Sequence, residues 1–112
     1  SRSMFNTIGI ITKPQDITSD ETARELGAFL KEQGVSLVEG EKAIEKNADL
    51  IIVVGGDGSI LSTARTYVDS NIPILGINLG RLGFLADVSV ESMTTVISDI
   101  LSGEYIKEKR YE

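Results

Sequence analysis

The feature that most constrains the fold is the segment DLIIVVGGDGS, residues 49–59, where an apolar run meets three glycines and one aspartate. The run from Leu50 to Val54 is too short for a helix and is typical of a strand buried on both faces of a parallel sheet. The residues that follow predict a helix over 59–71, with an apolar stripe formed by Ile60, Leu61, Ala64 and Val68. We therefore expect a central strand, a glycine loop and a helix in succession.

The rest of the chain continues this alternation. The sequence predicts further strands over 5–12, 35–40 and 72–78, a glycine-bearing loop over 79–87, and helices over about 20–33, 41–48 and 90–103. Ser19 or Asp20 is expected to cap the first of these helices and Gly34 to end it. The residues expected to face inward from these helices are Ala23, Leu26, Leu30, Ala43, Ile44, Met93, Val96, Ile97, Ile100 and Leu101. This order predicts an α/β fold with an open, doubly wound, mainly parallel sheet and helices on both faces.

Composition excludes several classes of function. The chain has 112 residues, of which 41% are hydrophobic and 25% charged, as expected for one soluble domain. Its net charge of −6, with KEKR near the end as the one basic cluster, argues against a nucleic-acid-binding protein. The absence of cysteine and histidine excludes disulfides, thiolate chemistry, imidazole bases and nearly every zinc site.

The two ends of the chain suggest its domain boundaries and compartment. Residues 1–3, before Met4, are interpreted as the remnant of an expression tag, and residues 4–104 as an α/β nucleotide-binding domain. The closing segment 105–112 is strand-like, without a turn or cap after it, and is interpreted as the start of a crossover into a missing C-terminal domain. Because the chain has neither a signal-peptide pattern nor an apolar stretch approaching the roughly 20 residues of a membrane span, we expect a cytoplasmic protein.

The glycine loop is a candidate phosphate site. In sheets of this kind ligands bind beyond the carboxyl ends of the strands, where this loop is expected to lie. Gly55, Gly56 and Gly58 lack a Cβ, and the helix that starts at about Ser59 presents unpaired N–H groups and a positive dipole end. The loop is neither a Walker loop nor a GxGxxG dinucleotide loop. An Asp-Gly hairpin turn is the alternative, against which the following helix argues.

Asp57 suggests what the phosphate site does. A carboxylate repels phosphoryl oxygens unless a divalent cation lies between them, or unless the carboxylate faces a hydroxyl group whose proton it accepts. Either arrangement indicates phosphoryl transfer. The alternative is that Asp57 merely caps the helix, a role for which Ser59 competes.

Two segments about 20 residues apart, VVGGDGS and GINLGRLGFL, resemble those of the NAD kinases. GGDG is shared with phosphofructokinases and with diacylglycerol and sphingosine kinases, whereas GINLGRLGFLAD is similar to the NAD kinase loop. The resemblance runs from about Phe5 through the closing GEYIKEKRYE. It implies a Rossmann-like N-terminal domain and transfer of the γ-phosphoryl group of ATP, or of polyphosphate, to the 2′-hydroxyl of the adenosine ribose of NAD. A divalent cation, Mg²⁺ or Mn²⁺, is the expected cofactor, and the full-length protein is expected to be a homodimer or homotetramer.

The resemblance also implies roles for residues of the glycine loop. Asp57 matches the general base of the family, which takes the proton from the acceptor hydroxyl, and Gly58 and Ser59 adjoin it in the nucleotide site. Gly55 and Gly56 match the glycines that leave room for phosphates. One position departs from many family members, because Ser62 stands where they often carry arginine. The phosphate charge must then be met by another group, such as Arg65, Arg81, a metal ion or a residue beyond this chain.

The second loop is expected to bind NAD. Phe84 matches a family aromatic residue that lines the adenine pocket and is reached through the turn at Gly83, although an ordinary core position is the alternative. Asn78 and Arg81 are candidate ligand contacts, with Arg81 suited to phosphate by its forked donors or else simply solvated.

Two other functions stay open from the sequence. One is a lipid or sugar kinase of the same GGDG superfamily, and the other is a nucleotide-binding module without catalysis. Because the family implies a second, β-rich domain that completes the pockets, this segment alone is expected to be inactive.

Overall fold

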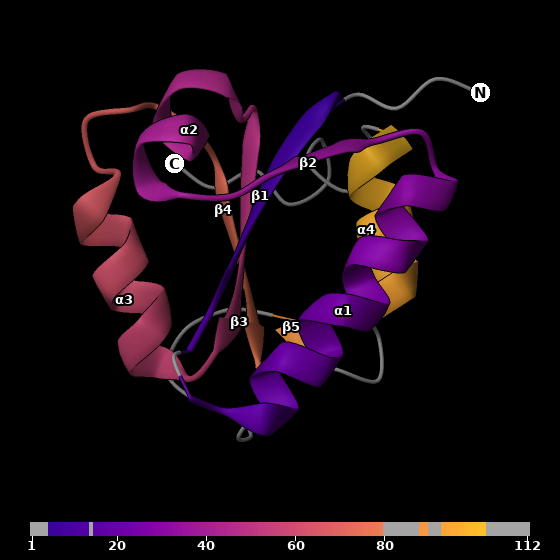
Figure 1. Ribbon diagram of the computed structural model, residues 1–112, viewed down its shortest axis with the longest axis horizontal. Coiled ribbons are helices and arrows are strands. Elements are labelled where there is room, and N and C mark those ends of the chain that lie inside the picture. The colour runs from indigo at the N-terminus through magenta and orange to yellow at the C-terminus, as the bar shows by residue number, and fades with distance from the viewer. Residues whose placement is uncertain (1–4, 14, 80–87, 90–92, 103–112) are drawn as a thin grey trace.

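A computed structural model describes residues 5–13, 15–79, 88–89 and 93–102 (Figure 1). Its elements are β1 (Thr7–Thr12), α1 (Ile17–Glu32), β2 (Ser36–Val38), α2 (Glu41–Asn47), β3 (Leu50–Gly55), α3 (Asp57–Thr66), β4 (Ile74–Asn78), β5 (Val88–Ser89) and α4 (Met93–Ser102). The strands form one parallel sheet of five, in the order β2-β1-β3-β4-β5. The predicted α/β fold class is confirmed, and β5 is a strand that the sequence analysis missed.

The sheet separates two hydrophobic cores. Leu50, Ile52 and Val54 of β3 belong to the core that α1 and α4 cover, and Ile51 and Val53 belong to the core that α2 and α3 cover. Figure 1 shows α1 and α4 on one side of the sheet and α3 and α2 on the other. Because β3 lies in the middle and is buried on both faces, its sequence is a continuous apolar run rather than an alternating one.

The order of the strands reverses between β1 and β3, near the middle of the sheet. The chain passes from β1 outward to β2 on one side, then crosses to β3 and continues to β4 on the other side. The segments that leave β1 and β3 therefore go to opposite faces of the sheet. In open parallel sheets such a reversal point is where ligands bind.

Helix α1 begins earlier than predicted. Its N-cap is Asp16, whose Oδ1 accepts a hydrogen bond from the backbone N–H of Ser19 at 3.0 Å. The predicted cap at Ser19 or Asp20 is therefore wrong, because both residues lie within the first turn. After the helix, Gly34 adopts a φ of +84°, a conformation that favours glycine, which agrees with its predicted role as the stop.

The apolar stripe predicted for α3 is confirmed at Ile60 and wrong at its other three positions. Leu61 is 46% exposed and Val68 69% exposed, and Ala64 is exposed as well. The side chains that face the core are Ile60, Thr63 and Tyr67. The helix ends at Thr66, and residues 67–71 form turns, so Val68 lies beyond the periodic part.

Most of the inward-facing residues predicted for the other helices are placed as expected. Leu26, Leu30, Ile44, Ile97 and Leu101 are buried, and Ala23 and Ala43 are half-buried. The side chains of Met93, Val96 and Ile100, the expected tag remnant 1–3 and the expected crossover 105–112 lie outside the described residues. No helix in the described part of the chain is long and apolar enough to cross a membrane.

Candidate active site

Asp57 lies at the first position of α3, directly after the glycine loop. The N-cap of this helix is Gly56, and no side chain makes a cap hydrogen bond there. The alternative role of Asp57 or Ser59 as the cap is therefore wrong. The hairpin alternative is wrong too, because the loop joins a strand to a helix and β3 pairs in parallel with both of its neighbours. The Asp57 carboxylate is left for another role.

The carboxylate of Asp57 is held by a side chain from the neighbouring strand. Nδ2 of Asn78 donates to Oδ1 of Asp57 at 2.9 Å. Asn78 is the last residue of β4, lies opposite Gly55 in the sheet and is 9% exposed. The backbone N–H of Leu79 donates to the carbonyl oxygen of Gly55 at 2.9 Å, which continues this pairing. The β3–β4 register thus fixes the orientation of one half-buried carboxylate at the carboxyl edge of the sheet.

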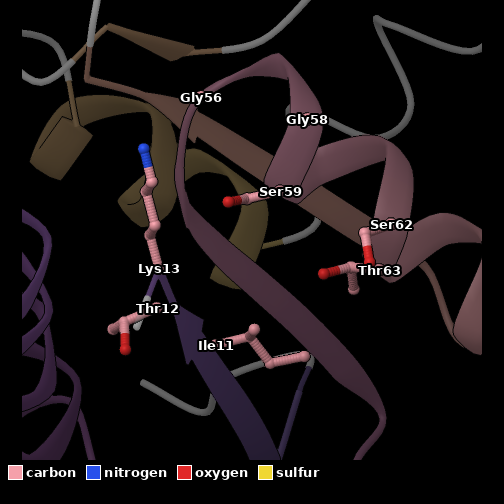
Figure 2. A pocket seen from close by; sticks show the side chains of 8 residues that line it. All are labelled: Ile11, Thr12, Lys13, Gly56, Gly58, Ser59, Ser62 and Thr63. Atoms are coloured by element: carbon pink, nitrogen blue, oxygen red, sulfur yellow. The ribbon is translucent and has the colours of Figure 1, made fainter. Parts of the chain in front are cut away.

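A cleft of about 510 Å³ opens on the other side of the glycine loop, between β1 and α3. It is lined by Ile11, Thr12, Lys13, Gly56, Gly58, Ser59, Ser62 and Thr63. Figure 2 shows the side chain of Lys13 extending from the end of β1 alongside the loop, with the hydroxyl groups of Ser59 and Thr63 directed from α3 toward β1. The cleft therefore lies at the reversal point of the strand order. It combines hydroxyl groups, glycine backbone and the ammonium group of Lys13.

The space available for a side chain differs among the three glycine positions of the loop. At Gly55 a Cβ would lie 2.9 Å from both Cβ and Oγ of Ser59, so packing within the protein excludes a side chain. At Gly56 and Gly58 a Cβ would meet nothing within 4 Å. The positive-φ glycines in the described part of the chain are Gly34 and Gly40, so backbone conformation does not require glycine at these two positions either. The open space beside Gly56 and Gly58 fits close approach by a ligand.

Ser19 connects the backbone at the ends of β1 and β3, next to the cleft, and was missed as a site residue. Its side chain is fully buried; Oγ accepts a hydrogen bond from the backbone N–H of Lys13 at 3.0 Å and donates to the carbonyl oxygen of Val54 at 2.8 Å. Because Thr12 and Val54 are the last pair of the β1–β3 ladder, the hydroxyl joins the two strands where their pairing ends. Helical spacing was the available signal, since Ser19 falls on the stripe of Ala23, Leu26 and Leu30.

The structure brings together six of the predicted site residues. Gly55, Gly56, Asp57, Gly58 and Ser59 form one continuous segment from the end of β3 into α3, and Asn78 contacts Asp57. The predicted residues Arg81, Gly83 and Phe84 lie outside the described residues. Lys13 and Thr12 were not singled out from the sequence, although their position directly at the end of a predicted strand was the signal that could have found them.

The arrangement resembles a phosphate site rather than a metal centre formed by the protein alone. Within the described ranges, no group of three or more Asp, Glu, His or Cys side chains could hold a metal ion. The glycine backbone, the start of α3 and Lys13 together suit an anion. On the opposite side of the loop, the Asp57 carboxylate can accept a proton from a hydroxyl group. This arrangement can therefore place a hydroxyl group and a phosphate on either side of one loop.

This chain is similar in sequence to known NAD kinases. Two curated relatives, the NAD kinases of Nitrosococcus oceani and Teredinibacter turnerae, are 40% and 37% identical to this chain, and each alignment covers 96% of the chain. The chain spans 42% of the length of each of these relatives.

Two solved structures share the fold. A yeast NADH kinase complexed with NADH has a TM-score of 0.74 at 21% identity, covering 88% of this chain and 38% of its own. An NAD kinase from Archaeoglobus fulgidus in complex with ATP has a TM-score of 0.65 at 25% identity, covering 87% and 37%. The family model that matches, over residues 36–105, is the ATP-NAD kinase N-terminal domain. Since that match includes more than half of the 112 residues, the chain belongs to the ATP-NAD kinase N-terminal domain family.

Proposed function

We propose that this chain is the N-terminal part of an NAD kinase, which transfers the γ-phosphoryl group of ATP, or of polyphosphate, to the 2′-hydroxyl of the adenosine ribose of NAD. The observation that carries the proposal is the Asp57 carboxylate, held by Asn78 at 2.9 Å beside a glycine loop with open space for phosphates. Family membership supports the choice of substrates.

Asp57 is the proton acceptor in this reaction. The 2′-oxygen of the ribose forms a bond to the γ-phosphorus while the bond from that phosphorus to the bridging β-γ oxygen breaks. The hydroxyl proton passes to the Asp57 carboxylate, and ADP and NADP leave. Because Asn78 holds Oδ1, the carboxylate keeps one orientation and can meet the hydroxyl without rearranging.

The other predicted site residues bind substrate in this proposal. The backbone at Gly55, Gly56 and Gly58, with Ser59 at the start of α3, receives the phosphates. Phe84, reached through the turn at Gly83, lines the adenine pocket of NAD, and Arg81 contacts a phosphate.

A divalent cation, Mg²⁺ or Mn²⁺, is the proposed cofactor. Mg²⁺ in kinases is usually held by one or two carboxylates together with substrate phosphates. Asp57 faces the acceptor hydroxyl in this proposal, and no group of three acidic side chains among the described residues could hold the ion by itself, so the donor phosphates would supply most of its ligands. The cation would neutralise charge on the phosphate chain.

The proposal extends to the whole protein. We place the kinase in the cytoplasm as a homodimer or homotetramer, with the remaining length of the family members completing the substrate pockets. Orientation of donor and acceptor supplies much of the rate in such reactions, so activity is assigned to the full-length protein and not to these 112 residues alone.

The proposed function is tested by offering the full-length protein ATP labelled at the γ-phosphate together with NAD, diacylglycerol or fructose 6-phosphate in parallel reactions. Label in NADP, and in neither other product, is the expected result. Label that enters only the lipid or only the sugar would show a kinase of another acceptor class. Nucleotide binding without any transfer would instead show a binding module.

A further inference from the structure

The cleft on the β1 side of the glycine loop poses a problem of charge. A triphosphate or polyphosphate carries several negative charges, and the chain itself has a net charge of −6. Arg65 is exposed in the last turn of α3 and is not among the residues that line the cleft, while Ser62 of the same helix lines it but carries no charge. Helix α3 therefore brings no positively charged side chain into the cleft, and another element has to supply one if the described residues are to meet the phosphate charge.

Resting on the function proposed above, we propose that Lys13 binds the phosphate chain of the phosphoryl donor in this cleft. Among the described residues that line the cleft, Lys13 alone carries a charge. It leaves β1 directly opposite the start of α3, so its ammonium group and the N–H groups of the helix start act on the same anion.

The backbone of Lys13 is anchored although its side chain is exposed. Its N–H donates to Oγ of Ser19, and the same hydroxyl donates to Val54 at the end of β3. The N–H of Ser19 in turn donates to the Asp16 carboxylate at 3.0 Å. This chain of bonds fixes the Cα of Lys13 relative to the glycine loop, and a Cβ built on Gly55 would lie 3.7 Å from the Cβ of Lys13. The lysine therefore starts from a defined point, so less ordering is needed when it binds phosphate.

The position of Asp57 separates donor from acceptor. Its carboxylate contacts Asn78 at the end of β4, whereas Lys13 lies at the end of β1, on the other side of β3. Phosphate oxygens are repelled by the carboxylate and attracted by the ammonium group. The donor phosphates therefore lie on the Lys13 side of the loop, and the acceptor hydroxyl approaches from the Asp57 side.

The test uses the full-length protein with Lys13→Met, Lys13→Arg and the double change Lys13→Met with Ser62→Arg. Lys31→Met is the matched control. Lys31 is an exposed lysine in the last turn of α1, at the other end of the helix from the cleft. Calorimetry measures the Kd for inorganic tripolyphosphate, and steady-state kinetics measure KM for ATP and for NAD. Loss of a charged hydrogen bond predicts a rise of roughly 10- to 100-fold in the Kd for tripolyphosphate and the KM for ATP in Lys13→Met, with KM for NAD little changed.

Two further results are expected. Lys13→Arg keeps tripolyphosphate binding near that of the parent protein, and Ser62→Arg restores it in the Lys13→Met background, because residue 62 is exposed and lines the same cleft. Unchanged tripolyphosphate binding in Lys13→Met, an equal loss in Lys31→Met, or a rise confined to the KM for NAD would overturn the proposal. A parent protein that binds tripolyphosphate at Lys13 but forms no NADP would overturn the proposed function and support the lysine site.

Discussion

Gly58 occupies a helical position at which alanine would be the better residue. It is the second residue of α3 and is exposed, and a Cβ there would meet nothing within 4 Å. Glycine costs up to about 1 kcal/mol relative to alanine within a helix. The structure gives no internal compensation for this cost, so we attribute the glycine to the space that a bound phosphate needs.

The variant Gly58→Ala is therefore expected to be at least as stable as the parent protein, by up to about 1 kcal/mol in urea unfolding. In the full-length enzyme the added methyl group should clash with bound donor and raise KM for ATP roughly tenfold or more. Gly55→Ala is the control with the opposite pattern, because its Cβ would lie 2.9 Å from Ser59 and should destabilise the fold by about 1–3 kcal/mol. A less stable Gly58→Ala protein with normal kinetics would contradict this interpretation.

At the scale of residues, the sequence predicted which groups lie together but not how they contact one another. The pattern around Asp57 was enough to place it in a glycine loop between a buried strand and a helix. Its bond to Asn78 spans 21 positions in the chain and depends on the β3–β4 register, which pairs Gly55 with Asn78. Lys13 and Ser19 were missed for the same reason, since their roles arise only when β1, α1 and β3 meet.

At the scale of elements, each helix on the α2–α3 face packs an isoleucine over a glycine of the sheet. Ile44 lies over Gly9 of β1, and Ile60 lies over Gly76 of β4, where built Cβ atoms would come within 2.7 Å and 2.6 Å of the isoleucine side chains. The helices can therefore approach the sheet closely at both places. This contact also explains the register of α3, in which Ile60 rather than Leu61 faces inward.

Gly76→Ala is expected to lower the free energy of unfolding by about 1–3 kcal/mol, because the nearest atom, Cδ1 of Ile60, must move. Ile60→Val removes that atom. The double variant should therefore lose less free energy of unfolding than the two single variants lose in sum. Urea unfolding of the four proteins gives the coupling energy. Strict additivity would show that the two residues do not compete for space.

Tyr67 links the end of α3 to the start of α2 by donating its hydroxyl hydrogen to the backbone oxygen of Glu41 at 3.4 Å. Burial, and then the negative charges of Glu41 and Glu45, raise the pKa of Tyr67 above its ordinary value of 10.0. A group whose pKa is raised by folding contributes its full stability below the unfolded pKa, and this contribution is lost as the pH rises through the folded pKa. Stability should therefore fall above pH 10.0.

Tyr67→Phe removes the titrating group and keeps the ring. Between about pH 9 and about pH 11, its free energy of unfolding should fall less than that of the parent protein in paired urea titrations. Equal slopes for the two proteins would show that Tyr67 does not couple folding to alkaline pH.

Element boundaries were predicted less well than element types. The pattern of residues 59–71 gave a helix and placed Ile60 inward correctly, but it was wrong about the rest of the buried face. Thr63 and Tyr67 pack inward, while Leu61 and Val68 stay exposed. Local hydrophobicity could not show this, since the glycine that receives Ile60 lies on another strand. The start of α1 was misplaced because the capping carboxylate of Asp16 precedes the apolar stripe by several residues.

At the scale of the whole molecule, the strand order is what produces the site. Alternation of strands and helices predicted a doubly wound parallel sheet, but alternation alone does not say that β1 and β3 are neighbours. The pairing of β1 with β3 places Lys13 and the cleft on one side of the glycine loop. The pairing of β3 with β4 places Asp57 and Asn78 on the other side. A single loop can then stand between phosphate donor and hydroxyl acceptor.

The turnover of the full-length protein with Asp57→Asn tests the central claim most directly. Asparagine is close to aspartate in size but cannot accept the acceptor proton, so NADP formation should fall roughly 100-fold or more while the unfolding transition stays in place. Asp69→Asn makes the same change at an exposed turn beyond the opposite end of α3 and should keep the parent rate. If Asp57→Asn turned over NAD at close to the parent rate, Asp57 would not be the base.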